Sequence, residues 1–589
     1  MATSPINVKA LVPVATAAAD PKRLAIVIAG AVSLGSYEAG VLYEVLDAIH
    51  HHNNHRDTLD NRANRVVIDV LTGASAGGMT AIILSQKLLF SADEFVGPYD
   101  NPLYNVWVNR IDLSGLQQTQ RDEPALHSLF SSNLIETISR EMLLSRYSSN
   151  PTPAAVRHAA VDGTIRVGVA LTNLNGIDYG YKVEPHGEFV YREFSDQMTR
   201  TVDASSDSAT FWEPLRRAAV ACGAFPIAFR AQDVDRTRTG GDKDDYSSDK
   251  LWEWKHDPRV FTYCDGGVLQ NQPLGMAKNL VDLVPGHLDQ ERRFYLFVSP
   301  HAKDAGEVDN FCERDADYAH MLARLVKVVI GQSGFRDWIT AQQINERIRL
   351  LDDRATGLKD AILAQTIAPS VLQQTATALI ALLFPGGEHQ PPGARVPETL
   401  DQAKVRITHQ YREEISELVK AEETKPELAG AAQAFRDSIL AFESAAGLGA
   451  RDEMCIYGIT ATESELAGAG LQAFLGFFDR AYREHDYNVG RLHARKVLND
   501  DKLSKKGNIG PLRGLELASP INPVDTRLDG LPMNRVAPGD LKEFKIGTRR
   551  RVNQMIDELT HHSWFESGVV KVAVDPMLNI VLDWLIHMS

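Results

Sequence analysis

The sequence predicts an α/β protein with a three-layer α/β/α core, a mainly parallel sheet and a largely helical additional region. Short apolar runs alternate with stretches of helical periodicity over residues 22–300. A glycine-rich turn follows each of the first two runs, as expected where a parallel strand leads into a helix. From residue 301 to residue 448, strand-like runs are few and helical periodicity dominates.

The expected strands are apolar runs, and the second is rich in β-branched residues, which is typical of a buried parallel strand. The runs cover residues 24–29, 66–71, 165–171, 259–264 and 293–298. Helices are expected at residues 36–50 and 78–90, where apolar residues recur on one face. Alternation of this kind places helices on both faces of the sheet and ligands at the carboxyl ends of its strands.

The rest of the chain is expected to be organised around this core. We expect a flexible leader at residues 1–21, the core at 22–300, a helical insertion or extension at 301–450, and a mixed region at 451–589 that packs on the core. Two polar segments inside the core, residues 201–214 and 231–258, are interpreted as surface flaps. Later elements are expected to be a strand at residues 453–460 and helices at residues 471–485 and 575–588.

Composition narrows the class of protein. The net charge of -15 disfavours nucleic acid as the main partner, because phosphate binding needs a basic face. The four cysteines are widely spaced, so neither a disulfide framework nor a structural zinc site is expected, and a reducing, cytoplasmic setting is the default. No apolar stretch approaches the roughly 18 residues of a spanning helix. Peripheral contact with a membrane stays open, and no cofactor or metal is predicted.

The pentapeptide around Ser75 carries the most information about chemistry. Gly73, Ser75 and Gly77 form a G-x-S-x-G pattern between an expected strand and an expected helix. A serine at such a junction lies on a tight turn with its hydroxyl exposed, and small neighbours let a substrate approach. The pattern therefore indicates a nucleophile elbow, and a glycine-rich βα turn without chemistry is the alternative.

A second glycine-rich turn, from Gly30 to Gly35, follows the first expected strand. Such a turn ahead of a helix points backbone N–H groups into one cavity. A phosphate loop is disfavoured because no lysine follows Gly35, and Val32 spoils a dinucleotide fingerprint. An oxyanion hole needs only backbone donors beside a nucleophile, so Gly30, Ala31, Val32 and Gly35 are its candidates. A tight turn with no other role is the alternative.

The third element is Asp265 followed by Gly266 and Gly267, at the end of a later strand. A carboxylate there can reach the same edge of the sheet as Ser75. If burial and hydrogen bonds tune its basicity, it can orient a serine hydroxyl and accept its proton. A simple Asp-Gly turn is the alternative.

Together these three elements resemble the patatin-like phospholipase family, over about residues 22–300. The family shows a glycine-rich oxyanion turn, a G-x-S-x-G motif and a D-G-G/A motif in this order. The resemblance implies a dyad of Ser75 as nucleophile and Asp265 as base, without histidine, acting on lipid acyl esters through an acyl-enzyme. Phe211, Trp212 and Trp252 are then candidate lid or interfacial contacts. Weaker similarity to long bacterial members covers residues 477–480 and 485–491.

The chain departs from the family pattern in the first turn. Ala31, Val32 and Leu34 stand where the family has two glycines and a basic residue. This departure motivates one rival function, a binding or scaffold protein on a degenerate core. A second rival is an α/β-hydrolase with a Ser-Asp-His triad that uses His287 or His301. The lipid class, the bond cleaved and the oligomeric state stay open.

The other histidines are assigned no chemistry. The cluster of His50, His51, His52 and His55 is interpreted as a solvated helix end, because no carboxylate or cysteine joins it at ligand spacing. His485 is interpreted as a packed, hydrogen-bonded histidine.

Overall fold

The computed structural model describes residues 21–55, 64–119, 123–182, 188–236, 260–284, 293–302, 321, 328, 336–389, 398–448, 454–469, 473–498 and 538–562. The chain divides into two compact units. The sheet unit contains residues 20–281, 291–337 and 456–589, and the helical unit is built mainly from residues 338–455. The leader expected at residues 1–21 lies outside the described residues except for its last position.

Eight of the described strands form one sheet in the order β10-β7-β1-β2-β3-β6-β5, with β4 paired to β3. The strands are β1 (Lys22–Ile28), β2 (Val66–Gly73), β3 (Ile165–Lys182), β4 (Glu188–Val202), β5 (Gln232–Asp235), β6 (Val260–Asp265), β7 (Arg293–Ala302) and β10 (Ile456–Thr462). The pairs from β10 to β3 are parallel, whereas β4, β5 and β6 join antiparallel. The predicted α/β fold with a mostly parallel sheet is confirmed.

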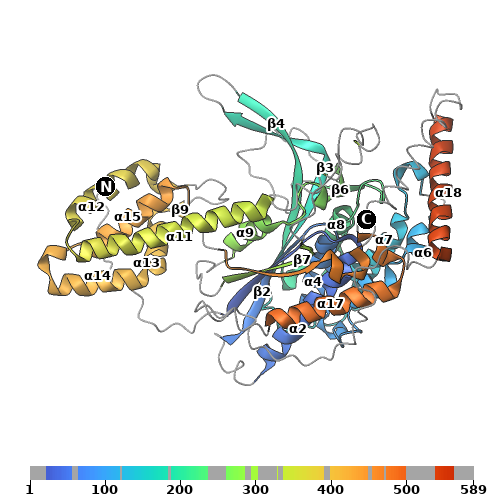
Figure 1. Cartoon of the computed structure of the whole chain (residues 1–589), viewed down its shortest axis with the longest axis horizontal. Helices are drawn as coiled ribbons and strands as arrows, with labels where there is room; N and C mark the ends of the chain where they lie inside the picture. The colour runs from blue at the N-terminus through green and yellow to red at the C-terminus, as the bar shows by residue number, and fades with distance from the viewer. Residues whose placement is uncertain are drawn as a thin grey trace. The chain divides into compact units, whose positions relative to one another are not determined.

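The direction of β6 was not predicted. It pairs antiparallel with β3, and the pairing starts at Leu171 opposite Asp265. Strand β2 ends earlier, with Gly73 opposite Val169. Because β3 continues beyond the end of β2, the backbone groups of its next residues pair with β6 instead, while β4 pairs with β3 from Ile165 onward. Strand β6 therefore runs toward the carboxyl edge of the parallel strands, and its last residue, Asp265, lies at that edge. Figure 1 shows the long hairpin of β3 and β4.

Two segments expected to be flaps are partly regular structure. Residues 201–214 contain the end of β4 and the start of α8 (Ala209–Cys222), and the side chain of Ser208 caps that helix. Trp212 is completely buried against Phe90, so its expected role as a lid or interfacial contact is wrong. In the second segment residues 232–235 form β5, whereas Trp252 lies outside the described residues.

Helices from distant parts of the chain pack on the sheet and on one another. The long ones are α2 (Gly35–Asn54), α4 (Ser75–Phe90), α7 (Ser132–Leu144), α8, α9 (Leu274–Asp282), α17 (Arg480–Leu498) and α18 (Pro538–His562). Short ones are α5 (Pro102–Tyr104), a π-helical turn (Asn105–Arg110) and α6 (Leu113–Gln117). Helices α2 and α17 lie side by side (Figure 1). None of the described helices combines the length and apolar character needed to cross a bilayer.

The helix expected at residues 471–485 is displaced. Phe474 and Phe477 belong to short turns, and α17 starts only at Arg480. Both phenyl rings are buried against aromatic residues of the core, so their apolar spacing reflects tertiary contact and not a helix face. The helix expected at residues 575–588 lies outside the described residues.

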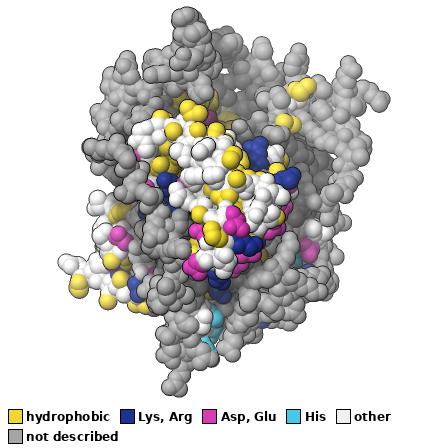
Figure 2. Space-filling view, turned by 90° about the vertical axis from the view of Figure 1, so that its left-hand side faces the viewer, with side chains coloured by type: hydrophobic (Ala, Val, Ile, Leu, Met, Phe, Trp, Pro, Cys, Tyr) yellow, Lys and Arg dark blue, Asp and Glu magenta, His cyan; other side chains and the backbone are white. Residues whose placement is uncertain are grey.

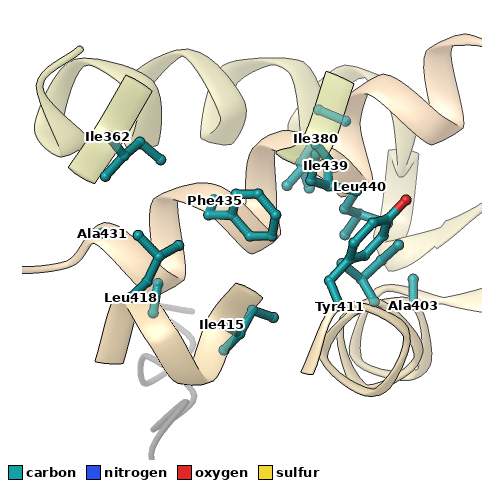
Figure 3. Packing of buried hydrophobic residues seen from close by; sticks show 14 of the residues in the cluster. Ile362, Ile380, Ala403, Tyr411, Ile415, Leu418, Ala431, Phe435, Ile439 and Leu440 are labelled. Carbon is teal, nitrogen blue, oxygen red and sulfur yellow. The ribbon is translucent and has the colours of Figure 1, made fainter. Parts of the chain in front are cut away.

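The helical unit has a hydrophobic core of its own. It contains α11 (Arg336–Leu363, from Trp338 onward), α12 (Pro369–Leu383), α13 (Leu400–Gln410), α14 (Arg412–Thr424) and α15 (Ala431–Ala445). Ile362, Ile415 and Leu418 pack around the fully buried ring of Phe435 (Figure 3).

The face of the molecule in Figure 2 mixes basic, acidic and hydrophobic side chains.

Candidate active site

Ser75 lies on a sharp turn between β2 and α4. Its φ of 51° is in the left-handed region, which is uncommon for a residue with a side chain. The turn needs glycine on both sides. A Cβ on Gly73 would overlap the backbone of Gly77, and a Cβ on Gly77 would overlap the carbonyl oxygen of Ala29. The two glycines of the predicted elbow are therefore places where backbones touch.

The Ser75 hydroxyl donates a hydrogen bond to Asp265, with 2.6 Å between Oγ and Oδ2. Both side chains are buried. The other carboxylate oxygen, Oδ1, accepts from the Gly267 N–H at 2.7 Å. The backbone of Asp265 is also held, because its N–H donates to Ala224 and its carbonyl accepts from the Thr172 hydroxyl. The carboxylate is therefore fixed on both oxygens.

The glycines after Asp265 allow close approach. A Cβ on Gly266 would overlap the carbonyl oxygen of Ala170 in β3. A Cβ on Gly267 would lie 2.7 Å from Oδ1 of Asn271 and 3.0 Å from Oδ1 of Asp265. Side chains at these positions would push Asp265 away from Ser75.

Burial raises the pKa of Asp265 from 3.8 to about 7, and the hydrogen bonds from Ser75 and Gly267 lower it in part. Burial disfavours the charged carboxylate because the interior solvates it poorly. A base whose pKa lies near the working pH combines a usable population of the basic form with a useful proton affinity. The Asp265 carboxylate is thus suited to accept a proton from Ser75.

The candidate oxyanion residues divide into two groups. The Gly30 N–H donates to the Asn271 carbonyl. The Gly35 N–H donates inside the turn to the carbonyls of Val32 and Ser33. In the described part of the chain we find no acceptor for the N–H groups of Ala31 and Val32. Of the four candidates, these two are therefore the ones whose N–H groups have no acceptor among the described residues.

The turn lies beside Ser75 in a strained conformation. A Cβ on Gly30 would lie 3.1 Å from Cβ of Ser75. Val32 has a φ of 52°, and left-handed backbone at a non-glycine residue costs on the order of 1–3 kcal/mol. Backbone strain held at such a place is a mark of a functional site.

A pocket of about 440 Å³, part of it open solvent, brings these groups together. Its lining is mostly apolar: Val32, Ser75, Ala76, Met79, Trp107, Ile111, Ile135, Gly223, Phe225, Phe229, Asp265 and Phe477. No histidine occurs among these described lining residues, and His287 and the side chain of His301 lie outside the description. The described residues also contain no cluster of metal-ligating side chains.

The other histidines that the sequence analysis discussed lie outside the residues that line this pocket. His50, His51, His52 and His55 occupy the last turn of α2 and its C-cap, where His52 contacts a backbone carbonyl. His485 is buried, with Nδ1 3.1 Å from Oδ1 of Asp486.

Several contributors to the site were not found from the sequence. Ala76 lines the pocket in the first turn of α4, where helix N–H groups have no partner within the helix. Asn271 holds Gly30 through its backbone carbonyl. Trp107 and Phe477 come from segments 32 residues after and 402 residues after Ser75, so no local motif could place them. Ala76 carried a local signal because it follows Ser75 directly in the motif, whereas Asn271 and Phe477 carried only the resemblance of their segments to the patatin-like phospholipase family.

Comparisons with known proteins agree with this geometry. A search of curated proteins found no match. A family model described as patatin-like phospholipase matches residues 26–278. The match contains all three motifs, from the turn at Gly30 through Ser75 to Asp265. Residues 26–278 of this chain therefore match a patatin-like phospholipase domain, which supports assignment of this region to that family.

Proposed function

We propose that this protein is a serine lipid acyl hydrolase in which Ser75 is the nucleophile and Asp265 is the general base. The observation that carries the proposal is the 2.6 Å hydrogen bond from Ser75 Oγ to Asp265 Oδ2 at the bottom of an apolar pocket. A buried carboxylate whose pKa is raised, and which faces a serine on a strained turn, is typical of a catalytic site.

The proposed reaction has two halves, acylation of Ser75 and hydrolysis of the acyl-enzyme. Ser75 Oγ attacks the ester carbonyl carbon while its proton passes to Asp265, and the carbonyl oxygen becomes an oxyanion held by the N–H groups of Ala31 and Val32. Collapse of this intermediate breaks the ester bond. The alcohol leaves with the proton from Asp265, and the acyl group stays on Ser75. Water then attacks the acyl-enzyme, giving its proton to Asp265, and the fatty acid leaves as Ser75 regains its proton.

The pocket favours a long-chain acyl group as the part of the substrate that is bound. Its described walls are aromatic and aliphatic, including Trp107, Phe225 and Phe229. Burying such surface yields about 25 cal/mol per Å², so each methylene adds binding free energy. None of the described lining residues is lysine or arginine, so these residues offer no cation to a phosphate head group.

Labelling with a fluorophosphonate probe tests the proposal. The wild-type protein should be labelled, and Ser75→Ala should not. Asp265→Asn should label much more slowly, because the proton acceptor is lost. Circular dichroism of each variant checks that it folds. Hydrolysis of p-nitrophenyl esters of increasing chain length should follow the same order of variants.

Two results would contradict the proposal. Unchanged hydrolysis in folded Ser75→Ala would remove Ser75 from the chemistry. Folded wild-type protein that neither labels nor hydrolyses esters, with and without phospholipid vesicles, would favour the scaffold function instead.

A further inference from the structure

The turn that carries Ala31 and Val32 adopts a conformation that its own residues disfavour. Val32 is β-branched, and such residues are genuine outliers at positive φ. Strain of this kind persists only where the surrounding structure over-determines it. One segment that contacts this turn lies about 440 residues further along the chain.

Residues 466–469 and 473–498, here called the C-terminal clamp, pack on this turn. The buried Ser33 hydroxyl donates to the carbonyl oxygen of Ala473, which itself has a φ of 64°. Gly476 leaves no room on the other side, since a Cβ there would lie 2.5 Å from Ser33 Oγ. A Cβ on Gly468 would lie 3.1 Å from the side chain of Leu34. The clamp therefore contacts the two residues that follow Val32.

The clamp is itself held in shape by a buried carboxylate. Asp486 in α17 accepts hydrogen bonds from the N–H groups of Ala467 at 2.7 Å and Gly468 at 2.9 Å. This charge-assisted pair fixes the turns that cover Ser33. The Arg483 guanidinium donates to the carbonyl of Gly476 at 2.9 Å and fixes the second of these turns.

Helix α17 is also locked to α2, which begins where the strained turn ends. The two backbones touch at two glycines. A Cβ on Gly40 would overlap the carbonyl oxygen of Tyr487, and a Cβ on Gly490 would overlap that of Tyr37. Further along, the fully buried Arg491 donates to Glu44 at 2.8 Å. Helix α2 cannot shift along its axis without breaking these contacts.

We propose that the C-terminal clamp holds the oxyanion turn in its working conformation, with Ser33 as the positioning residue that connects them. The clamp lies about 190 residues beyond the end of the family match at residue 278, so the matched domain does not contain everything that its active site needs. This inference rests on the proposed hydrolase function. It also accounts for the pattern at residues 485–491, where Asp486, Gly490 and Arg491 each make one of these contacts.

The test compares Ser33→Ala with wild-type protein in ester hydrolysis. Active sites are first counted by complete fluorophosphonate labelling, so that kcat refers to competent sites only. We expect kcat per site to fall about ten- to hundredfold, because donors displaced by a fraction of an ångström stabilise the oxyanion poorly. KM should stay within about twofold of the wild-type value. The pH at which activity is half lost should not change, because the contact between Ser75 and Asp265 is untouched.

Ser85→Ala is the matched control. Ser85 is also completely buried, and its hydroxyl also donates to a backbone carbonyl, that of Ile82 at 2.8 Å. It lies in α4 and is not part of the clamp. A purely structural loss would reduce the number of labelled sites in both variants and leave kcat per site unchanged.

The inference is overturned if kcat per site in Ser33→Ala stays within twofold of the wild-type value, or if KM rises and kcat does not fall. If Ser33→Ala does not fold, Ser33→Cys keeps a hydrogen-bond donor that is weaker and sits on a larger atom, and it should also lower kcat per site. Wild-type kcat per site in that variant would equally overturn it. Failure of the proposed function is seen separately, as missing hydrolysis by wild-type protein or full hydrolysis by Ser75→Ala.

Discussion

Asp265→Asn should stabilise the protein at neutral pH, even though it removes the proposed base. The asparagine side chain has the same shape, and its oxygen can still accept the hydrogen bond from Gly267. What disappears is the buried charge. Burial raises the pKa of Asp265 from 3.8 to about 7, so between these values the folded protein holds a proton that the unfolded chain releases.

The sign and size follow from proton linkage. Because the folded state binds more protons in this interval, the free energy of unfolding of the wild-type protein falls as pH rises. The slope is about 1.4 kcal/mol per pH unit for one group. From pH 5 to pH 7 the wild-type protein should therefore lose about 2 kcal/mol relative to Asp265→Asn, because the slope flattens as the carboxyl becomes half ionised near pH 7. Above pH 7 the difference should level off, because the carboxyl is then ionised in both states.

Urea unfolding followed by tryptophan fluorescence at pH 5, 6, 7 and 8 measures this difference directly. Comparing the two proteins at each pH cancels the other titrating groups. Asp100→Asn, at an exposed aspartate, controls for loss of one surface charge and should change the unfolding free energy by no more than about 0.5 kcal/mol. A difference between wild type and Asp265→Asn that stays constant from pH 5 to pH 8 would refute the raised pKa, and with it the argument that Asp265 is tuned as a base.

Three further predictions concern catalysis, the pocket and the helical unit. The kcat/KM of the wild-type protein should fall tenfold per pH unit below about pH 7, because the free enzyme needs the Asp265 carboxylate; a profile flat down to pH 5 would contradict this. Phe477→Ala should raise KM for long-chain esters more than for acetate esters, by roughly ten- to hundredfold for about 1.5–3 kcal/mol of lost burial, and equal effects on both would show that Phe477 does not contact the acyl chain. Phe435→Ala should destabilise the helical unit by about 3–5 kcal/mol, because it leaves a cavity among Ile362, Ile415 and Leu418; a thermal unfolding scan with an unchanged transition would contradict that packing.

Local patterns were enough for the elements that position the nucleophile. The strand before Ser75 and the helix after it were predicted within two to three residues, because a buried parallel strand and a helix have different apolar periods. The same reasoning failed around residues 201–214 and 471–485. There the apolar side chains of Trp212 and Phe474 are set by contacts with the core, which have no period in the sequence.

The candidate site was also predicted only in part, because some of its features are local and others depend on distant residues. Glycine spacing alone indicated the elbow at Ser75, the turn at Gly30 and the carboxylate at Asp265, since tight turns and close backbone approach leave glycine as a local requirement. The sequence did not indicate that, in the described part of the chain, the N–H groups of two of the four candidate oxyanion residues find no acceptor. That depends on which carbonyl each N–H meets, and the partner of Gly30 lies at Asn271.

The sequence by itself determined the fold class, the order of the motifs and the type of residue at each key position, because each of these depends on neighbours within one turn or one strand. Only the tertiary structure decided that β6 runs antiparallel, that Asp265 meets Ser75 across 190 residues of chain, and that the C-terminal clamp covers the oxyanion turn. The physical reason is that strand direction and helix contact are chosen by the packing of complete surfaces. Side chains distant in sequence form those surfaces only when the whole sheet unit has folded.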